Sequence, residues 1–314
     1  IDVFNGDADG ICALHQLRLA NPVDSVLVTG IKRDINLLIR VSAGSDDKST
    51  VLDISLDKNR EGLMRLLQAG AEIMYFDHHF AGDIPVDENL ETRIDTDSNM
   101  CTSLLVNDYL GGEYLPWAVA AAFGDNLFSA AENAARPLNL TANQLEELKL
   151  LGTCINYNGY GASLDDLFFT PDALYKMIHP YSNPFDFIKN ENGYQLLLNG
   201  YRGDIANAEA IEPKHEDDTH ALYLLPDEKW ARRVSGVFAN QLAQQNPNRA
   251  HAMLTQKNDA GFLVSVRAPL NNKTGADELC RQFTTGGGRK AAAGINHLPE
   301  EQYQQFFNAF IAAF

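Results

Sequence analysis

The sequence predicts an α/β protein with two domains, a larger one built on a parallel sheet and a smaller one after it. Three observations predict this. The chain has 314 residues, of which 45% are hydrophobic, enough for two cores. Short β-branched runs alternate with amphipathic stretches through the first third of the chain. The texture then changes between residues 171 and 226, where Pro, Asn, Tyr and charged residues become frequent.

The first third of the chain alternates expected strands with expected helices. We expect strands at residues 1–4, 25–29, 50–54 and 71–76. We expect helices between them, at residues 11–19, 34–40 and 60–68. This alternation is typical of a parallel sheet with helices on both faces.

The rest of the chain predicts a helical segment, a connector and a second domain. The pattern is helical over residues 102–151, and the polar run IEPKHEDDTH predicts a solvated connector. We expect a first domain at 1–195, a linker with a helical segment at 196–220 and a second domain at 221–314. The second domain has three strand-like runs, ALYLL, RAHAMLTQ and GFLVSVRAP, then a glycine-rich loop and a terminal helix.

The charge of the chain limits its partners. The formal net charge is -17 at pH 7. Such an acidic protein repels phosphate backbones at long range, so long duplex nucleic acid is not an expected partner. A short phosphate-bearing substrate remains compatible, provided that metal ions or a local basic pocket reverse the field.

Cysteine usage and hydropathy predict a reduced, cytoplasmic protein. Cys12, Cys101, Cys154 and Cys280 are widely spaced, which fits neither a disulfide framework nor a thiolate zinc site. No apolar run of membrane-spanning length and no signal peptide is predicted, so no membrane partner is expected. Because the sequence begins inside an expected strand, we expect a few native residues before Ile1.

Acidic and imidazole groups follow several expected strands. In open parallel sheets, ligand sites form at the carboxyl ends of the strands. Three strands carry such groups: Asp7 and Asp9 after the first, Asp53 after the third, and Asp77, His78 and His79 after the fourth. Asp125, in AAAFGDN, follows a small-residue helix and a glycine. We expect these groups to meet at one edge of the sheet. Histidines 179, 215, 220, 251 and 297 have no such companions.

Carboxylate and imidazole groups together suit Mn²⁺, Mg²⁺, Co²⁺ or Zn²⁺ at a hydrolytic centre. Several aspartates in one place indicate two cations that share a bridging carboxylate, one activating water and both stabilising a phosphoryl oxygen. Asp9 or Asp53 alone would fit a helix N-cap equally well. The combination at several strand ends favours the metal centre. Asp7 and Asp9 would then be ligands, with Gly10 permitting the tight turn between strand and helix.

A second cluster lies in VSVRAP and FTTGGGRKAAAGIN. Its candidate anion-binding residues are Gly286, Gly287, Gly288, Arg289 and Lys290. We expect a helix to start at Ala291, whose N-terminus would add to the loop's outward N–H groups. Arg267, at the end of an expected strand, can fork onto a phosphate. The alternative is a glycine turn with solvated basic residues; the three basic side chains together favour anion binding.

Four short segments resemble, in order, the motifs of the DHH phosphoesterase superfamily. They are NGDADG, the aspartate of VLDIS, DHH and GDN. GGGRKAAAG is similar to the glycine motif of the associated C-terminal domain. The resemblance covers nearly the whole chain, and its layout is similar to that of RecJ-type exonucleases, nanoRNases, cyclic-dinucleotide phosphodiesterases and exopolyphosphatases. It implies a DHH domain with helices on both sheet faces, a smaller α/β domain and an active site in the cleft between them.

The resemblance also implies a metal-binding role for five residues. Asp7 would bind a first metal and Asp9 a second, with Asp53 bridging both. His78 and Asp125 would complete the second site. The implied cofactors are two divalent ions, manganese foremost, with cobalt and magnesium as alternatives.

Further roles concern the substrate. Asp77 would orient His78, as carboxylates do for ligating imidazoles. His79 would lie near the scissile phosphate, where it could contact substrate or assist proton transfer. Arg267 and residues 286–289 would hold the terminal phosphate or nucleotide of the substrate.

Two positions depart from the family pattern. Many members supply a histidine shortly before the first aspartate, where this chain has Val3 and Asn5. The first metal site is therefore expected to be weaker or to hold a different ion. Members usually have histidine after the three glycines, where this chain has Arg289. Arginine is permanently charged and forks onto phosphates, so the pocket is expected to favour phosphate-rich substrates.

The leading hypothesis is a two-metal phosphohydrolase or phosphodiesterase that cleaves P–O bonds in short substrates. Short oligonucleotides, 3′-phosphoadenosine phosphate and cyclic or linear dinucleotides are candidates. The alternative of an exopolyphosphatase acting on linear polyphosphate is favoured by the lack of aromatic residues flanking the basic ones. An alternative of another class is a non-catalytic nucleotide or phosphate sensor, against which the complete ligand set argues. The aromatic tail FFNAFIAAF predicts either core or the face of a homodimer.

Overall fold

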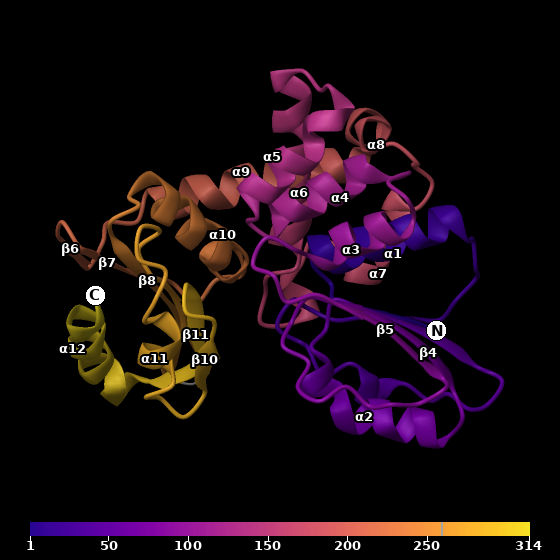
Figure 1. The fold of residues 1–314 in the computed structure, drawn as a ribbon. Coiled ribbons are helices and arrows are strands. Elements are labelled where there is room, and N and C mark those ends of the chain that lie inside the picture. The colour runs from indigo at the N-terminus through magenta and orange to yellow at the C-terminus, as the bar shows by residue number, and fades with distance from the viewer. Residues whose placement is uncertain (259) are drawn as a thin grey trace. The chain divides into compact units, whose positions relative to one another are not determined.

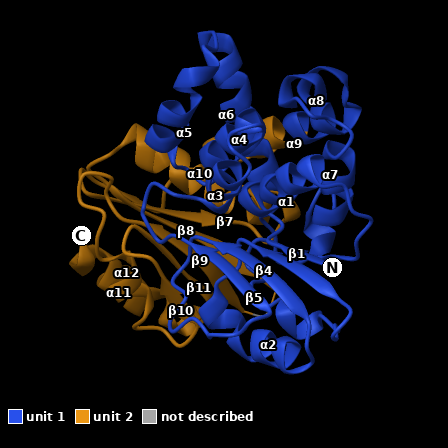
Figure 2. Ribbon diagram, turned by 45° about the vertical axis from the view of Figure 1, so that its right-hand side comes forward, with its two compact units in different colours: residues 1–199 blue, residues 200–314 orange. Residues whose placement is uncertain are grey.

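The computed structural model describes residues 1–258 and 260–314. It divides into two compact units, residues 1–199 and 200–314, and each is described by itself (Figure 2). The division falls inside helix α9 (Asn192–Glu209). The second half of α9 is joined to the following helix, α10 (Lys229–Gln245), by an ion pair between Asp204 and Arg233, 2.8 Å apart.

The first unit is built on a five-stranded sheet in the order β2-β1-β3-β4-β5. Its strands are β1 (Asp2–Phe4), β2 (Leu27–Val28), β3 (Lys48–Leu52), β4 (Glu72–Asp77) and β5 (Leu90–Ile94). Every neighbouring pair is parallel, so the carboxyl ends of all five strands lie at one edge. The predicted α/β class with a parallel sheet is confirmed; β5 extends the sheet beyond the strands that we expected.

Helices cover both faces of this sheet (Figure 1). α2 (Leu56–Gln68) lies on one face, where its Leu63 and Leu66 share a buried cluster with Val51 and Ile73 of the strands. The other face is covered by α1 (Ala8–Ala20) and α3 (Thr102–Tyr109). The remaining helical elements of the unit are α4 (Leu115–Gly124), α5 (Phe128–Ala135), α6 (Ala142–Asn158), α7 (Pro171–Ile178) and α8 (Pro184–Asn190), with short 3-10 turns at Leu38–Arg40, Arg136–Leu138 and Leu164–Asp166.

The helix expected at residues 34–40 is only the 3-10 turn Leu38–Arg40. The side chain of Asn59 explains the difference. It donates to the carbonyl oxygen of Ile35 at 2.7 Å and accepts from the N–H of Leu38 at 3.1 Å. These backbone groups are thereby bonded to a side chain of α2 and not to the backbone partners that an α-helix would give them.

Helices α4 and α6 cross at small residues, which fixes the end of α4. A Cβ atom on Gly152 would lie 1.8 Å from the carbonyl oxygen of Ala120, so only glycine permits this approach. On Gly124, a Cβ atom would lie 2.7 Å from the carbonyl oxygen of Gly152. The crossing sets the position of Asp125, which follows α4 directly.

The second unit has a six-stranded mixed sheet in the order β10-β11-β9-β8-β7-β6. Its strands are β6 (His215–Glu216), β7 (His220–Leu225), β8 (Ala250–Lys257), β9 (Gly261–Arg267), β10 (Gly286–Gly288) and β11 (Ala292–Pro299). β7 and β8 are parallel and the other pairs are antiparallel. Its helices are α10, α11 (Ala276–Cys280) and α12 (Tyr303–Ala313), with a 3-10 turn at Glu300–Gln302.

The helix expected to start at Ala291 is wrong, because this segment is the strand β11. The three glycines form β10, which pairs antiparallel with β11. Arg289 and Ala292 exchange backbone hydrogen bonds of 2.9 and 3.1 Å, so Lys290 and Ala291 are the tip of a tight hairpin. Arg289 and Lys290 are exposed. No helix begins at Ala291; the N-terminus of α11 lies beside the hairpin, where the N–H of Ala276 donates to the carbonyl oxygen of Lys290 at 3.0 Å.

The aromatic tail belongs to the core of the second unit. Phe306 and Phe310 of α12 are fully buried and share a cluster with Phe283, Val264 and Ile295. The core alternative for FFNAFIAAF is therefore the one that the structure supports. Within the described part of the chain, no helix is both long enough and apolar enough to cross a membrane.

Candidate metal centre

Asp7 lies between β1 and α1 and caps the helix. Its Oδ1 accepts hydrogen bonds from the N–H groups of Asp9 and Gly10, at 3.1 and 3.2 Å. Gly10 is required here, because a Cβ atom would lie 2.3 Å from the carbonyl oxygen of Asn5. The N-cap interpretation therefore holds for Asp7, and it leaves only Oδ2 of this carboxylate turned to other partners.

Asp9 is buried and joins α1 to the start of α3. Its Oδ2 accepts from the N–H of Thr102 at 2.8 Å, and its Oδ1 accepts from the N–H of Ser103 at 2.7 Å. These are N–H groups that α3 cannot satisfy internally. Oδ2 also lies 3.8 Å from Nε2 of His78. Burial, together with the carboxylates of Asp125 and Asp7, raises the pKa of Asp9.

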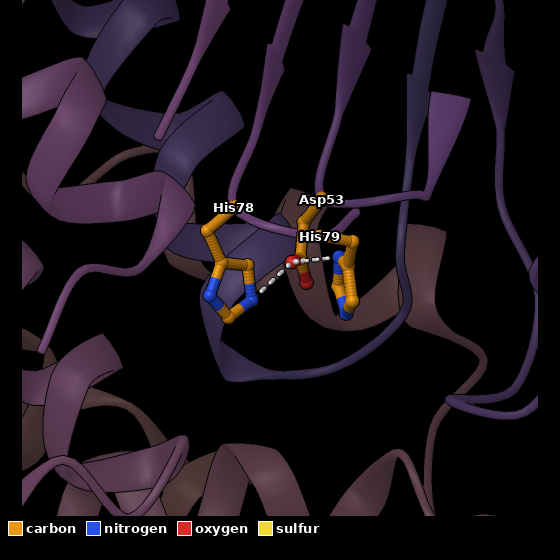
Figure 3. Close-up of side chains that lie close together, drawn as sticks. All are labelled: Asp53, His78 and His79. Atoms are coloured by element: carbon orange, nitrogen blue, oxygen red, sulfur yellow. Dashed lines mark ion pairs between the residues drawn. The ribbon is translucent and has the colours of Figure 1, made fainter. Parts of the chain in front are cut away.

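Asp53 follows β3 in a left-handed backbone conformation, with φ of 58°. Aspartate and asparagine tolerate this region better than other residues that carry a Cβ atom. Its N–H donates to the carbonyl oxygen of Phe76 at 3.0 Å. Its Oδ1 lies 3.3 Å from Nε2 of His78 and 3.9 Å from Nδ1 of His79 (Figure 3). Asp53 is thus turned into the space between the two histidines.

The carboxylate of Asp53 is in an environment that disfavours its charge. Burial raises the pKa of Asp53 well above its usual range, and the carboxylates of four nearby aspartates raise it further: Asp9, Asp7, Asp125 and Asp77. A divalent cation between these groups would reverse that balance.

His78 is oriented by a backbone carbonyl group and faces three carboxylates. Its Nδ1 lies 2.9 Å from the carbonyl oxygen of Met100, so this nitrogen carries the proton. Nε2 then faces Asp53 Oδ1 at 3.3 Å, Asp125 Oδ2 at 3.7 Å and Asp9 Oδ2 at 3.8 Å. Metal-ligating histidines usually donate from their other ring nitrogen to a backbone carbonyl or a carboxylate, as His78 does here.

Asp77 contacts the other histidine of the triplet. The resemblance implied that Asp77 orients His78, and this is wrong. Nδ1 of His79 lies 2.7 Å from Asp77 Oδ1, while Met100 holds His78. The reason is geometric, since consecutive residues at the end of β4 point in different directions. His79 remains partly exposed, and Asp77 is fully buried.

Lys32 is a member of the site that the sequence analysis did not identify. Its Nζ contacts Oδ2 of Asp7, and it lies 2.9 Å from Oδ1 of Asn156 and 3.4 Å from Oδ1 of Asp125. Burial alone would lower the pKa of Lys32, but Asp7, Tyr160 and Asp125 raise it well above its usual value. For Asp7 the effect of burial has the opposite sign and would raise the pKa, but the Lys32 ammonium holds the pKa of Asp7 at about 2.

The donor atoms fit a divalent cation on the His78 side of the site. Asp9, His78 and Asp125 offer ligand atoms within 4.8 Å of one another, and so do Asp53, His78 and His79. Oδ2 of Asp125 is buried and has no hydrogen-bond partner among the described residues. Oxygen ligands with one or two imidazole nitrogens suit Mn²⁺, Mg²⁺ or Zn²⁺.

The structure brings together the expected metal-binding residues of the first unit. In the second unit, Arg267 is hydrogen-bonded to groups of α10. Asp7, Asp9, Asp53, His78 and Asp125 meet at the carboxyl edge of the parallel sheet. In the second unit, Arg267 donates from Nε to Oδ1 of Asn240 and from Nη2 to the carbonyl oxygen of Gly236, at 3.3 Å for the latter. These two bonds join β9 to α10.

A further group of possible ligand atoms lies where β6 meets β7. His215, Asp217 and His220 bring ligand atoms within 4.8 Å of one another, so the statement that these two histidines lack companions is wrong. Asp217 also accepts from the N–H groups of Thr219 and His220, both at 2.7 Å. These bonds close the turn between the strands, which accounts for the position of Asp217.

Comparisons with known proteins give structural matches only. No protein-family model and no curated protein matches the sequence. Among solved structures, a DHH-domain protein titled as a member of the s1p family of ribosomal proteins has 13% identity and a TM-score of 0.66, over 99% of this chain and 85% of that one. The exonuclease RecJ bound to manganese has 16% identity and a TM-score of 0.52, over 99% and 88%.

A third match is a pGpG-specific phosphodiesterase, PggH from Vibrio cholerae. It has 13% identity and a TM-score of 0.57, over 100% of this chain and 99% of that one. At such identities these likenesses describe the fold. Together with the strand order, they show that this chain shares the fold of these proteins, the first of which is titled as a DHH-domain protein.

Proposed function

We propose that this protein is a metal-dependent phosphoesterase, with its metal centre at the carboxyl edge of the parallel sheet in the first unit. The observation that carries the proposal is the position of His78 Nε2, which lies 3.3 to 3.8 Å from oxygens of Asp53, Asp125 and Asp9. The ligand oxygens of Asp9 and Asp125 also lie within 4.8 Å of each other, and buried carboxylates this close repel one another unless a cation lies between them.

A bound divalent cation supplies two effects to phosphate ester hydrolysis, polarisation of a phosphoryl oxygen and a lower pKa for a coordinated water. Asp9, Asp53, His78 and Asp125 would hold the cation, with manganese foremost and cobalt or magnesium as alternatives. His79, whose Nδ1 lies 2.7 Å from Oδ1 of Asp77, is the proposed group that contacts the scissile phosphate or moves a proton. The second cation of the two-metal mechanism, with Asp7 as ligand, stays a prediction.

We propose short oligonucleotides and linear dinucleotides as the substrates. The likeness to an exonuclease and to a pGpG-specific phosphodiesterase supports this class. The net charge of -17 argues against long duplexes. The exposed Arg289 and Lys290 at the β10–β11 hairpin are the proposed contacts for a terminal phosphate. Arg267 and the adjacent glycines, Gly286, Gly287 and Gly288, stay predictions as parts of the same phosphate site.

The test is a panel of substrates given to the Mn²⁺-loaded full chain. The panel holds 5′-labelled dinucleotides, 3′-phosphoadenosine phosphate, cyclic di-AMP and tripolyphosphate, and an Asp53→Asn variant serves as the control. We expect the unmodified protein to cleave the dinucleotides in a metal-dependent way, and we expect Asp53→Asn not to cleave them. Faster release of phosphate from tripolyphosphate would favour the exopolyphosphatase. Binding of these compounds without metal-dependent turnover of any of them would favour the sensor and overturn the proposal.

A further inference from the structure

Lys32 places a fixed positive charge inside the carboxylate cluster. The sheet order brings it there, because β2 lies next to β1 and Lys32 follows β2. Its backbone is held on both sides. The N–H of Lys32 donates to the carbonyl oxygen of Gly159 at 2.8 Å, and its carbonyl oxygen accepts from the Nδ2 group of Asn5 at 3.4 Å.

The ammonium group has an oxygen partner for each of its three protons. These partners are Oδ2 of Asp7, Oδ1 of Asn156 at 2.9 Å and Oδ1 of Asp125 at 3.4 Å. An ammonium offers three donors and no acceptor, so this set satisfies it completely. Three oxygens gathered around one small positive centre are also what a metal ion would require.

Asp7 has little left to offer a metal ion. Its Oδ1 accepts from two backbone N–H groups of α1, and its Oδ2 contacts Lys32. The two oxygens of Asp125 have different neighbours: Oδ1 faces Lys32, and Oδ2 lies 3.7 Å from Nε2 of His78. The carboxylate of Asp125 therefore lies between the ammonium and the cation site on the His78 side.

We infer that the centre binds a single divalent cation, and that the Lys32 ammonium takes the place of the second cation expected from the resemblance. A second divalent ion on Asp7 would lie within a few ångströms of the ammonium, where like charges repel strongly. Asn5 supports the arrangement, since its side chain anchors Lys32 at a position where many family members supply a metal-binding histidine. The inference rests on the proposed function for the first cation. It differs from the two-metal expectation in that the Lys32 side chain occupies the place of the second cation.

Metal stoichiometry tests the inference independently of activity. The full chain is titrated with Mn²⁺ by calorimetry, its metal content is measured after dialysis, and its electron paramagnetic resonance spectrum is recorded. We expect one Mn²⁺ per chain and a spectrum without exchange coupling. In Lys32→Met, which keeps most of the side-chain length but removes the charge, we expect a second equivalent and an exchange-coupled signal. Lys176→Met, at an exposed lysine paired with Asp172, is the matched control and should bind one ion.

The outcomes separate this inference from the proposed function. Two exchange-coupled ions in the unmodified protein would overturn the inference and leave the phosphoesterase proposal intact. No binding of Mn²⁺, Co²⁺ or Mg²⁺ by the unmodified protein would overturn both. A folded Lys32→Met that still binds one ion would show that the ammonium does not limit the number of ions. If Lys32→Met fails to fold, the count for the unmodified protein alone decides.

Discussion

Oδ1 of Asp77 lies 2.7 Å from Nδ1 of His79, although His78 is the residue that faces the carboxylates. The two histidines of the triplet are therefore held by different partners, His78 by the carbonyl oxygen of Met100 and His79 by a buried carboxylate. In the proposed function, metal binding by His78 and substrate contact by His79 therefore depend on different supporting groups, so mutations should separate the two.

Asp77→Asn should lower the rate of catalysis without changing metal binding. The amide keeps the size of the side chain but lacks the charge that orients His79. We expect kcat for dinucleotide cleavage to fall about 10- to 100-fold, the range typical of lost supporting groups. Steady-state kinetics and Mn²⁺ titration of the same preparation check this. A large loss of Mn²⁺ affinity would instead mean that Asp77 supports a metal ligand.

Asp53→Asn should stabilise the metal-free protein while abolishing activity. It removes one buried charge from a cluster of like charges, and asparagine tolerates the φ of 58° at this position. We expect the free energy of unfolding in EDTA to rise by about 1–2 kcal/mol, as is common when a strained functional site is neutralised. Denaturant unfolding with and without Mn²⁺ measures this.

Asp53→Ala is the matched variant for this prediction. Alanine also removes the charge, but it occupies a left-handed conformation at greater cost, by about 1 kcal/mol. Its stability in EDTA should therefore lie below that of Asp53→Asn. Equal stabilities would show that the backbone conformation at this position contributes little.

Asp9→Ala should have the opposite effect on stability. Asp9 carries charge in the same cluster, but its two oxygens also accept from the N–H groups of Thr102 and Ser103. Truncation leaves both buried donors without an acceptor, at a cost of about 1–3 kcal/mol for each unsatisfied group. We expect the free energy of unfolding in EDTA to fall, measured beside Asp53→Asn. A stabilised Asp9→Ala would mean that charge repulsion outweighs the capping of α3.

The aspartates were predictable because parallel strands deliver their following residues to one edge, whatever the details of the loops. Lys32 was not, since no motif marks it and only the position of β2 beside β1 brings it to Asp7. The partner of His78 was equally hidden, because a backbone carbonyl such as that of Met100 has no side-chain signature.

The segment AAAGIN shows a different limit. Alanine favours helices, so the sequence predicted a helix at Ala291. The segment instead pairs with β9 on one side and β10 on the other, with Ala293 and Ile295 buried. Its two-residue alternation is visible only once those neighbouring strands are known, because small residues give a weak hydrophobic pattern.

His15 should make the first unit less stable in mild acid. It is fully buried, its Nε2–H donates to the carbonyl oxygen of Tyr181 at 2.8 Å, and its ring meets that of Trp117 edge to face. Burial lowers the pKa of His15 from 6.5 to about 3. The unfolded chain therefore binds the extra proton between these two values, and stability is lost as the pH falls from about 6.5 toward 3. His15 should lower the free energy of unfolding by about 2 kcal/mol at pH 5 relative to pH 7.

Urea unfolding tests this prediction. The free energy of unfolding is measured against pH for the unmodified protein and for His15→Gln, which keeps a hydrogen-bond donor, and the two slopes are compared. An unchanged slope in His15→Gln would assign the acid sensitivity to other groups.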